Sequence, residues 1–198
     1  MGDENETSIK IEDLRLWDLF RAGNHPAYTQ LVNRYYKQLF NYGRRFCQDR
    51  EFLMDCIQEV FYELWNRRER INSTASVKWY LCKAVRLRIF RDQSKWNRNE
   101  EVSGDYNFLV EFNIESKIID DLNLSELSKK IKDILNSLPP RQQEIMYLRF
   151  YEGLSLDQIS EIMEISNQSL RNLLHKSYKN FRSEWILLLI LLADRKFN

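Results

Sequence analysis

The residues best suited to chemistry lie between positions 166 and 182, a stretch that holds four Lys or Arg side chains and no acid. Asn, Gln and Arg can read base edges in the major groove of DNA through paired hydrogen bonds, whereas Lys and Ser suit phosphate contacts. This composition indicates a surface for duplex DNA; an ordinary amphipathic pair of helices is the alternative. The candidate contacts are Asn167, Gln168, Ser169, Arg171, Asn172, His175 and Lys176.

A second basic tract, residues 77–98, has seven Lys or Arg side chains against one acid, Asp92, and therefore a local charge of +6. Aromatic residues are interleaved with the bases along it. Unpaired DNA bases stack on aromatic rings while cations bind the phosphates, so the tract indicates contact with single-stranded or melted DNA. A helix with core aromatics and solvated bases is the alternative. The candidate contacts are Lys78, Trp79, Tyr80, Lys83, Arg86, Arg88 and Arg91.

The third candidate surface is an acidic stripe. Asp55, Glu59 and Glu63 follow one another at intervals of four residues, which places them along one side of a helix, and no base occurs between residues 51 and 66. Such a stripe has no use for DNA but suits a basic protein surface, with Trp65 as an anchor. A solvated helix face is the alternative. The candidate protein-binding residues are Asp55, Gln58, Glu59 and Trp65.

Catalytic and metal-binding patterns are missing from the sequence. Cys47, Cys56 and Cys82 form no CxxC pair and have no ligand-like spacing with His25 or His175. The sequence also lacks paired histidines, a nucleophile with an adjacent base and a glycine-rich phosphate loop. We therefore expect no catalytic residue, no metal and no cofactor, and a protein that is not an enzyme.

Three features of the sequence bear on location. The first ten residues are acidic and polar, unlike a secretion signal, and an odd number of cysteines suits a reducing compartment. The apolar run from Trp185 to Ala193 has nine residues, whereas about 20 are needed to span a bilayer. The prediction is a cytoplasmic protein without membrane insertion.

Apolar residues recur at helical spacing over most of the chain, which contains only five Gly and three Pro. These features predict an all-α fold of two small helical domains joined by an acidic linker. The expected domains are residues 9–98 and 124–198, with the linker at 99–123. The expected helices span residues 14–20, 26–46, 50–66, 76–96, 124–137, 141–151 and 155–163, with a long helix from residue 167.

The second domain contains the pattern of a helix-turn-helix. Ser155 and Gln158 form a capping box at the start of one short helix, and residues 164–166 make a tight turn before the long one, which would enter the major groove.

Upstream, residues 99–127 hold eight acids against Lys117, yet apolar side chains among them indicate that the linker packs on its own domains or on a partner. The net charge of +1 is thus a sum of opposed blocks.

Three motifs, taken in order, resemble those of bacterial sigma factors. Residues 55–61 and 64–65, DCIQEVF and LW, resemble the D-x-x-Q-E-V-F-x-x-L-W signature. Residues 80–86, YLCKAVR, resemble the W-L-x-R-I-A-R stretch of the promoter-melting region. Residues 138–143, LPPRQQ, together with the helix-turn-helix, resemble the second conserved domain. The order of the motifs, the acidic linker and the short length are similar to those of the extracytoplasmic-function (ECF) class of the sigma-70 family.

The resemblance implies a dissociable subunit of RNA polymerase, with core RNA polymerase and promoter DNA as partners. In that role Asp55, Gln58 and Glu59 would dock on the clamp helices of the largest polymerase subunit. The tract 77–98 would capture melted bases of the −10 element, and residues 167–176 would read the −35 element as duplex. The linker would run near the RNA exit path. The apolar run 185–193 would extend the last helix against the second domain or, alternatively, bind an anti-sigma factor.

The sequence departs from the family pattern at three positions: Leu87 stands where Asn is common, Tyr80 where Trp leads its motif, and Gln168 where a small residue is common. We expect Gln168 to give the chain its own −35 preference. A stand-alone dimeric helix-turn-helix regulator is the rival interpretation, but it leaves the acidic stripe and the tract 77–98 without a role. We also expect the free chain to bind promoter DNA poorly, because its acidic segments compete with its basic ones.

Overall fold

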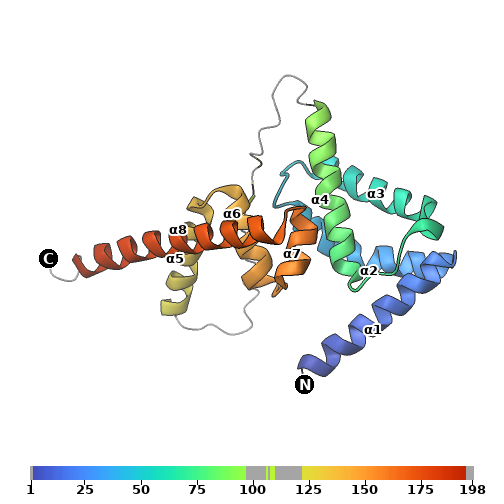
Figure 1. The fold of residues 1–198 in the computed structure, drawn as a ribbon, viewed down its shortest axis with the longest axis horizontal. Coiled ribbons are helices and arrows are strands. Elements are labelled where there is room, and N and C mark those ends of the chain that lie inside the picture. The colour runs from blue at the N-terminus through green and yellow to red at the C-terminus, as the bar shows by residue number, and fades with distance from the viewer. Residues whose placement is uncertain (1, 97–105, 107, 110–121, 195–198) are drawn as a thin grey trace. The chain divides into compact units, whose positions relative to one another are not determined.

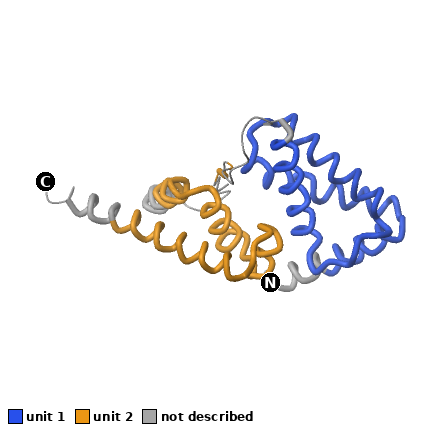
Figure 2. Tube along the Cα trace, turned by 45° about the horizontal axis from the view of Figure 1, so that its top comes forward, with its two compact units in different colours: residues 1–103 blue, residues 104–198 orange. Residues whose placement is uncertain are grey.

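The computed structural model describes the backbone of residues 2–96, 106, 108–109 and 122–194, and the side chains of residues 11–94, 106, 108–109 and 129–186. The chain forms two compact units, residues 1–103 and 104–198 (Figure 2). Every regular element among the described residues is a helix, as the sequence predicts. Most of the expected linker, residues 99–123, lies outside the described residues.

Four α-helices make up the described part of the first unit (Figure 1). They are α1 (Gly2–Arg21), α2 (His25–Gly43), α3 (Arg50–Asn66) and α4 (Val77–Trp96). A short 3₁₀ turn, Arg68–Arg70, follows α3. Helix α2 contacts the other three helices, and α3 also contacts α4. The surfaces predicted on residues 55–65 and 77–98 therefore belong to neighbouring helices of one bundle.

Side-chain caps determine where two of these helices begin. The Asn24 side chain accepts a hydrogen bond of 2.9 Å from a backbone N–H in the first turn of α2, where Pro26 also stands. Asp49 accepts two such bonds, of 3.0 and 3.1 Å, at the start of α3. Between α1 and α2, Gly23 has a φ of +86°, in the left-handed region that favours glycine. These caps stabilise the first turns of α2 and α3.

The core of the first unit explains which face of α3 stays exposed. Apolar residues of α3 recur every three or four positions and are buried: Leu53, Cys56, Ile57, Val60, Phe61 and Leu64. Between them, Asp55, Gln58 and Glu59 are exposed. Because a helix repeats every 3.6 residues, burial of one stripe turns the other outward. The acidic stripe is therefore accessible, as predicted.

Two predicted boundaries in this unit are wrong. Helix α1 begins at Gly2, whereas the prediction was residue 14. The prediction relied on apolar periodicity, which the polar first turns of α1 lack. Helix α2 ends at Gly43 rather than at residue 46. There the N–H of Phe46 donates to the carbonyl of Gly43 at 2.9 Å, a tight turn that brings the Phe46 ring to 5.5 Å from the ring of Phe90. A Cβ at Gly43 would lie 2.4 Å from Leu53 Cδ1, so glycine lets α2 and α3 approach closely.

The three cysteines differ in accessibility, and we expect their reactivity to follow it. Cys56 and Cys82 are buried, whereas Cys47 is half-buried. Burial raises the pKa of the Cys56 thiol to about 12, so almost none of it is the reactive thiolate at pH 8. With Ellman's reagent at pH 8, Cys47 should react first, and the other two only after denaturation. Rapid reaction that persists in a Cys47→Ser control would contradict this assignment.

In the second unit the described helices are α5 (Leu122–Ser137), α6 (Pro140–Met146), α7 (Leu156–Met163) and α8 (Asn167–Asp194) (Figure 1). A π-helical turn, Tyr147–Tyr151, follows α6. Helix α8 contacts α5, α6 and α7 and so holds the unit together. The helices begin within two residues of the predicted positions. The expected helix 141–151 is α-helical only to Met146, and its remaining residues form the π-helical turn.

Helix α6 is enclosed by the rest of the second unit. Every residue from Gln142 to Leu148 is buried, so this helix is buried on all sides and not on one face alone. The π-helical turn widens the helix by one residue per turn, which keeps Tyr147 and Leu148 inside while Phe150 is 57% exposed. Gln143, from the LPPRQQ motif, donates hydrogen bonds of 3.1 Å to the carbonyl of Asn136, in the last turn of α5, and of 2.6 Å to that of Leu138, just after the helix.

Two aromatic side chains of the expected linker pack on the second unit. Phe108 is 2% exposed, and its ring centroid lies 5.9 Å from that of Tyr147. The hydroxyl of Tyr106 donates a hydrogen bond to the carboxylate of Glu144, which is fully buried. Of the two packing surfaces that the sequence left open, the chain's own domains or a partner, these two residues use the second unit of the chain itself.

Helix α7 and the first turns of α8 form the predicted pair of helices. The predicted capping box is present: Ser155 Oγ accepts from the N–H of Gln158 at 3.3 Å, and the Gln158 side chain accepts from the N–H of Ser155 at 2.9 Å. In the turn, Glu164 has a φ of +53°, a conformation that glycine often supplies. Ser160 Oγ donates to the carbonyl of Ile165 at 2.7 Å and fixes the path of the chain into α8.

Loss of the capping box should loosen α7 without unfolding the chain. We expect Ser155→Ala to destabilise the second unit by about 1 kcal/mol, because the backbone N–H of Gln158 in the first turn of α7 loses its side-chain acceptor. The measurement is hydrogen exchange of peptides from residues 155–163, which should lose protection about fivefold. Ser183→Ala, on the exposed part of α8, is the matched control. Equal protection in the two variants would contradict a role for the cap.

The apolar run 185–193 continues α8 as a helix, as predicted. The rings of Phe181 and Trp185 stack with centroids 6.2 Å apart, and Ile186 is 44% exposed. The side chains beyond residue 186 lie outside the described residues. In the described part of the chain, no helix is both long enough and apolar enough to cross a membrane.

Candidate nucleic-acid and protein interfaces

The acidic stripe on α3, Asp55, Glu59 and Glu63, is accessible along its length but differs in charge pairing. The side chains of Glu59 and Glu63 are 51% and 38% exposed, and both contact Arg88 of α4. Among the described residues, Asp55 has no ion-pair partner. Gln58, beside it, is exposed. The end of the stripe nearest Asp55 therefore offers a carboxylate and an amide to a basic or polar partner.

Trp65, the predicted anchor, does not lie on the acidic stripe. It follows Glu63 by two residues, which is about 200° around the helix. Its indole is half-buried, with ring centroids 5.0 Å from Tyr28 and 5.4 Å from His25. The guanidinium of Arg68 lies 4.6 Å from the ring. Because Trp65 packs α3 against α2, we remove it from the candidate protein-binding set.

The seven candidates on α4 face three different surroundings. A groove between α3 and α4 is lined by Tyr80, Arg88 and Arg91. A second cavity, formed with α1 and α2, is lined by Lys78 and Trp79. Lys83 is half-buried and Arg86 is buried. The structure therefore does not bring all seven side chains to one surface.

Arg86 belongs to the core of the first unit. It is 5% exposed, and its guanidinium carbon lies 4.6 Å from the ring centroid of Phe90 and 6.0 Å from that of Phe46. A guanidinium held against two rings stabilises the bundle by cation–π contact, and it does not reach a DNA phosphate from there. We therefore remove Arg86 from the candidate DNA-binding set.

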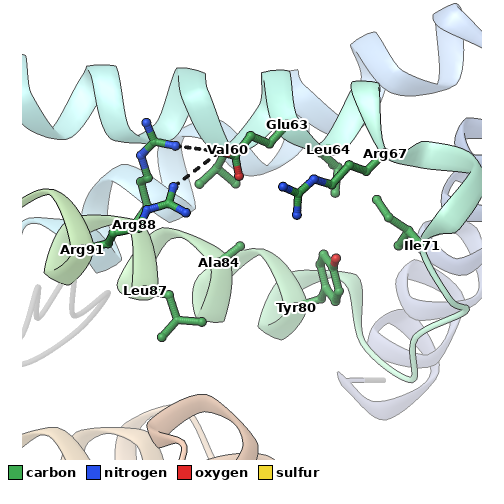
Figure 3. Close-up of a pocket in the computed structure, with 10 residues that line it drawn as sticks. All are labelled: Val60, Glu63, Leu64, Arg67, Ile71, Tyr80, Ala84, Leu87, Arg88 and Arg91. Carbon is green, nitrogen blue, oxygen red and sulfur yellow. Dashed lines mark hydrogen bonds and ion pairs between the residues drawn. The ribbon is translucent and has the colours of Figure 1, made fainter.

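The groove between α3 and α4 has a volume of about 390 Å³ and brings charged side chains together from both helices (Figure 3). Glu63 and Arg67 enter it from the side of α3, and Arg88 and Arg91 enter it from α4. At its other end Tyr80 is 37% exposed, and burial raises the pKa of its hydroxyl. Arg67 was not predicted from the sequence, although the basic run RRER at residues 67–70, soon after the acidic stripe, is a signal that could have indicated it.

Arg88 connects this groove to the acidic stripe. Its Nε lies 2.5 Å from Asp92, its Nη1 donates to Glu63 at 2.9 Å, and its Nη2 lies 3.5 Å from Glu59. Burial by itself would lower the pKa of Arg88, but the hydrogen bond to Asp92 and the three carboxylate charges raise it. Glu59 and Arg88, which the sequence assigned to separate surfaces, are therefore in contact.

The second cavity places an aromatic ring beside a cation. Its volume is about 670 Å³, and the Lys78 Nζ lies 4.3 Å from the ring centroid of Trp79. Its lining also includes a polar network in which Asp13 accepts hydrogen bonds from Arg34 and from the hydroxyl of Tyr35. Burial and this hydrogen bond raise the pKa of Tyr35, so the phenol stays protonated. A ring beside an open cavity suits stacking of an unpaired base.

The seven candidates on α8 are all exposed, in the first three turns of the helix. Leu170, which is fully buried, turns the opposite face toward the core. Asn167 Nδ2 donates to Asp157 at 3.1 Å, and Gln168 Nε2 donates to Asn172 at 3.2 Å. The three amide side chains are exposed, so their remaining donors and acceptors can meet those of base edges. This is the one predicted surface that the structure keeps complete.

Metal ligands do not gather in the part of the chain that the structure describes. No group of three or more His, Cys, Asp or Glu side chains there could hold a metal ion. The accessible polar residues lie on helix faces and in two open cavities, an arrangement suited to binding extended partners such as nucleic acid or another protein.

Two family models match the chain and together cover more than half of it. The model for sigma-70 region 2 matches residues 31–98, within the first compact unit. The model for sigma-70 region 4 matches residues 128–181, within the second. The three motifs that resemble sigma factors lie inside these two matches, in the same order.

Curated relatives carry corresponding descriptions. The chain is 22% identical over 166 residues to the probable RNA polymerase sigma factor RfaY of Xanthomonas campestris pv. campestris, covering 82% of this chain and 41% of that protein. It is 20% identical over 159 residues to the ECF RNA polymerase sigma factor SigK of Mycobacterium sp. (strain JLS), covering 79% of this chain and 82% of SigK. The chain thus spans less than half of the first relative and most of the second.

Two solved structures share the fold. CnrH, in complex with the cytosolic domain of CnrY, has a TM-score of 0.54 at 17% identity, covering 86% of this chain and 95% of that one. The sigma factor RpoE, in complex with the anti-sigma factor NepR from Bartonella quintana, has a TM-score of 0.55 at 15% identity, covering 80% and 96%. At these identities the likeness shows the common fold alone.

Proposed function

Because this chain belongs to the sigma-70 family, in its extracytoplasmic-function class, we propose that it binds core RNA polymerase and directs promoter-specific initiation of transcription. The observation that carries the proposal is the match of the region 2 and region 4 models to two separate compact units, in that order. Such a subunit contributes binding rather than catalysis, so the chain is not an enzyme. Since a bacterial polymerase and its promoters share the cytoplasm, the chain acts there.

The polymerase-binding surface that we propose is the exposed face of α3. Asp55, Gln58 and Glu59 lie on it, opposite the buried apolar face of the same helix. A basic surface on the clamp helices of polymerase would complement these carboxylates and steer the encounter. Asp55 is the main contact in this proposal, because among the described residues its carboxylate forms no ion pair within the chain.

For the −10 element we propose two binding positions for melted DNA. The cavity beside Trp79 and Lys78 offers a ring for stacking and a cation for a phosphate. The groove of Tyr80, Arg88 and Arg91 offers the same combination, with Arg67 added. Lys83 remains a candidate from its place on the same helix.

For the −35 element we propose the exposed face at the start of α8. Arg171 and Lys176 supply positive charge, and the amides of Asn167, Gln168 and Asn172 supply paired donors and acceptors for base edges. The capping box of α7 and the buried Leu170 hold this face in place. A helix anchored in this way can enter the major groove as a rigid body.

We also propose an anti-sigma factor as a partner. Both solved structures that share the fold are complexes, one of them with a protein described as an anti-sigma factor. The candidate contact on this chain is the apolar run 185–193, in which the described Ile186 is 44% exposed. A protein with an apolar helix would suit an apolar run of this kind.

The first test of the proposed function is gel filtration of the full chain with core RNA polymerase. A 1:1 complex supports the proposal, because two units that bind polymerase and promoter need no second copy of the chain. A chain that ignores core polymerase but binds a palindromic duplex tightly as a free dimer would overturn it, in favour of the stand-alone regulator.

A further inference from the structure

Glu63 holds both α4 arginines of the groove between α3 and α4 (Figure 3). Its Oε1 accepts a hydrogen bond of 2.9 Å from Arg88 Nη1 and a longer one, of 3.4 Å, from Arg91 Nη2. One carboxylate oxygen therefore lies between two guanidinium groups on successive turns of α4. A third cation, Arg67, lines the same groove.

The position of this oxygen is one that a phosphate oxygen can take. Guanidinium groups bind carboxylates and phosphates with the same donors at similar distances. The side chains of Arg91 and Glu63 are 50% and 38% exposed, so the position is open to solvent. Tyr80, in the same groove, supplies a ring on which a base can stack. The groove can thus bind a nucleotide, but a carboxylate of the chain occupies its anion position.

The same carboxylate belongs to the acidic stripe. Glu59, one turn earlier on α3, lies 3.5 Å from Arg88. A basic partner that binds the stripe and a phosphate that binds in the groove would therefore both break the same ion pairs, those of Glu59 and Glu63 with the arginines of α4. A cation that binds Glu59 and Glu63 takes carboxylates away from Arg88 and Arg91. Asp92 still holds Arg88 through its Nε, at 2.5 Å, and leaves the other nitrogens of the guanidinium for a new acceptor.

We propose that Glu63 is an internal competitor for the phosphate backbone of single-stranded DNA, and that polymerase removes it by binding the acidic stripe. This inference rests on the proposed function, because it couples the two surfaces assigned above. In the free chain Glu63, together with Asp92 and Glu59, neutralises Arg88 and Arg91 and so weakens binding of melted DNA. In the complex with polymerase Glu63 is paired to a partner cation, and the two arginines bind phosphate. By linkage, each binding event favours the other by the same factor.

The test is Glu63→Gln in the full chain, with binding to a fluorescein-labelled (dT)₂₀ single strand followed by fluorescence anisotropy. Glutamine keeps the size of the side chain and removes its charge. We expect E63Q to bind (dT)₂₀ about 5- to 10-fold more tightly than the wild-type chain at low salt. The slope of log K against log salt should steepen by about 0.7, since Arg88 stays paired with Asp92 and Glu59 and the freed Arg91 neutralises one more phosphate.

Glu51→Gln is the matched control, because it loses the same charge on the same helix about 18 Å away. Its affinity for (dT)₂₀ should stay within about twofold of the wild type. Arg91→Gln in the E63Q background should return the affinity to the wild-type level, since the gain depends on a freed arginine. With saturating core polymerase, E63Q and wild type should differ by less than about twofold.

The inference is overturned if E63Q binds (dT)₂₀ no more tightly than E51Q. A lower melting temperature without a gain in DNA binding counts as that outcome, because it would show Glu63 to be only a structural ion-pair partner. The proposed function is scored separately, by complex formation between the wild-type chain and core polymerase. If that complex forms and E63Q shows no gain, this inference alone fails; if it does not form, the proposed function fails.

Discussion

An Asp55→Lys chain is expected to bind core RNA polymerase about 30-fold more weakly than the wild-type chain while keeping its fold. Reversal of one charge in a desolvated charge pair costs at least about 2 kcal/mol, which corresponds to that factor. Asp55 is exposed on α3 and, among the described residues, has no ion-pair partner. Its replacement should therefore leave the bundle of α1–α4 intact. The measurement is a titration of labelled chain with core polymerase, followed by anisotropy.

Asp18→Lys is the matched control, because Asp18 is an exposed acid on α1 that makes one surface ion pair with Arg21. It should bind polymerase within about threefold of the wild type. Gln58→Ala should weaken binding in the same direction as Asp55→Lys, by less. Glu59 is a less clean probe, because its reversal also disturbs Arg88. Equal binding by D55K and D18K would remove α3 from the polymerase-binding surface.

An Arg171→Ala chain is expected to bind −35 duplex DNA about 5- to 100-fold more weakly, with full retention of polymerase binding. One paired contact from Arg to a base edge contributes about 1–3 kcal/mol of discrimination. Arg171 is exposed near the start of α8, beside the ordered amides of Gln168 and Asn172. The measurement is competition for a labelled duplex that carries the mapped −35 element, against the same duplex with that element scrambled.

Lys129→Ala, an exposed base on α5, removes the same charge and should change duplex affinity by less than about twofold. Lys176→Ala should weaken all duplexes alike and flatten the salt dependence by about one unit, as expected for a phosphate contact. D55K should leave −35 binding unchanged. If D55K and R171A fail in the same assay, the division of labour between the two units is wrong.

Exposure of the candidate residues could be predicted from the sequence where a helix buries one face and exposes the other. On α3 the apolar residues recur at helical spacing, so burial of one face left Asp55 and Gln58 outside. On α8 the same logic applied to Leu170 and the seven polar residues of its exposed face. The capping box at the start of α7 could be predicted because its two hydrogen bonds join residues only three positions apart, Ser155 and Gln158.

Helix α4 could not be predicted in the same way, because it has neighbours on several sides. Arg86 is buried against two rings, one of which, Phe46, lies forty residues earlier in the chain. Arg88 is drawn to Glu63 and Glu59 of α3 by packing that spacing along one helix does not reveal. For the same reason the sequence treated the acidic stripe and the tract 77–98 as separate surfaces.

The groove between α3 and α4 also changes how the near-zero net charge is understood. Opposed blocks of charge along the chain account for the total of +1. In the folded first unit part of this opposition is direct contact, with Glu63 between Arg88 and Arg91. The expected weak DNA binding of the free chain then has a local cause in addition to long-range repulsion from acidic segments.

The most direct test of the central claim is transcription in vitro from fragmented genomic DNA with core polymerase, with and without the full chain, followed by mapping of transcript starts. We expect new start sites that share two sequence elements, centred near −10 and −35, and the loss of these start sites with D55K and with R171A. An unchanged set of start sites, from a wild-type chain that is folded and present in excess over polymerase, would contradict it.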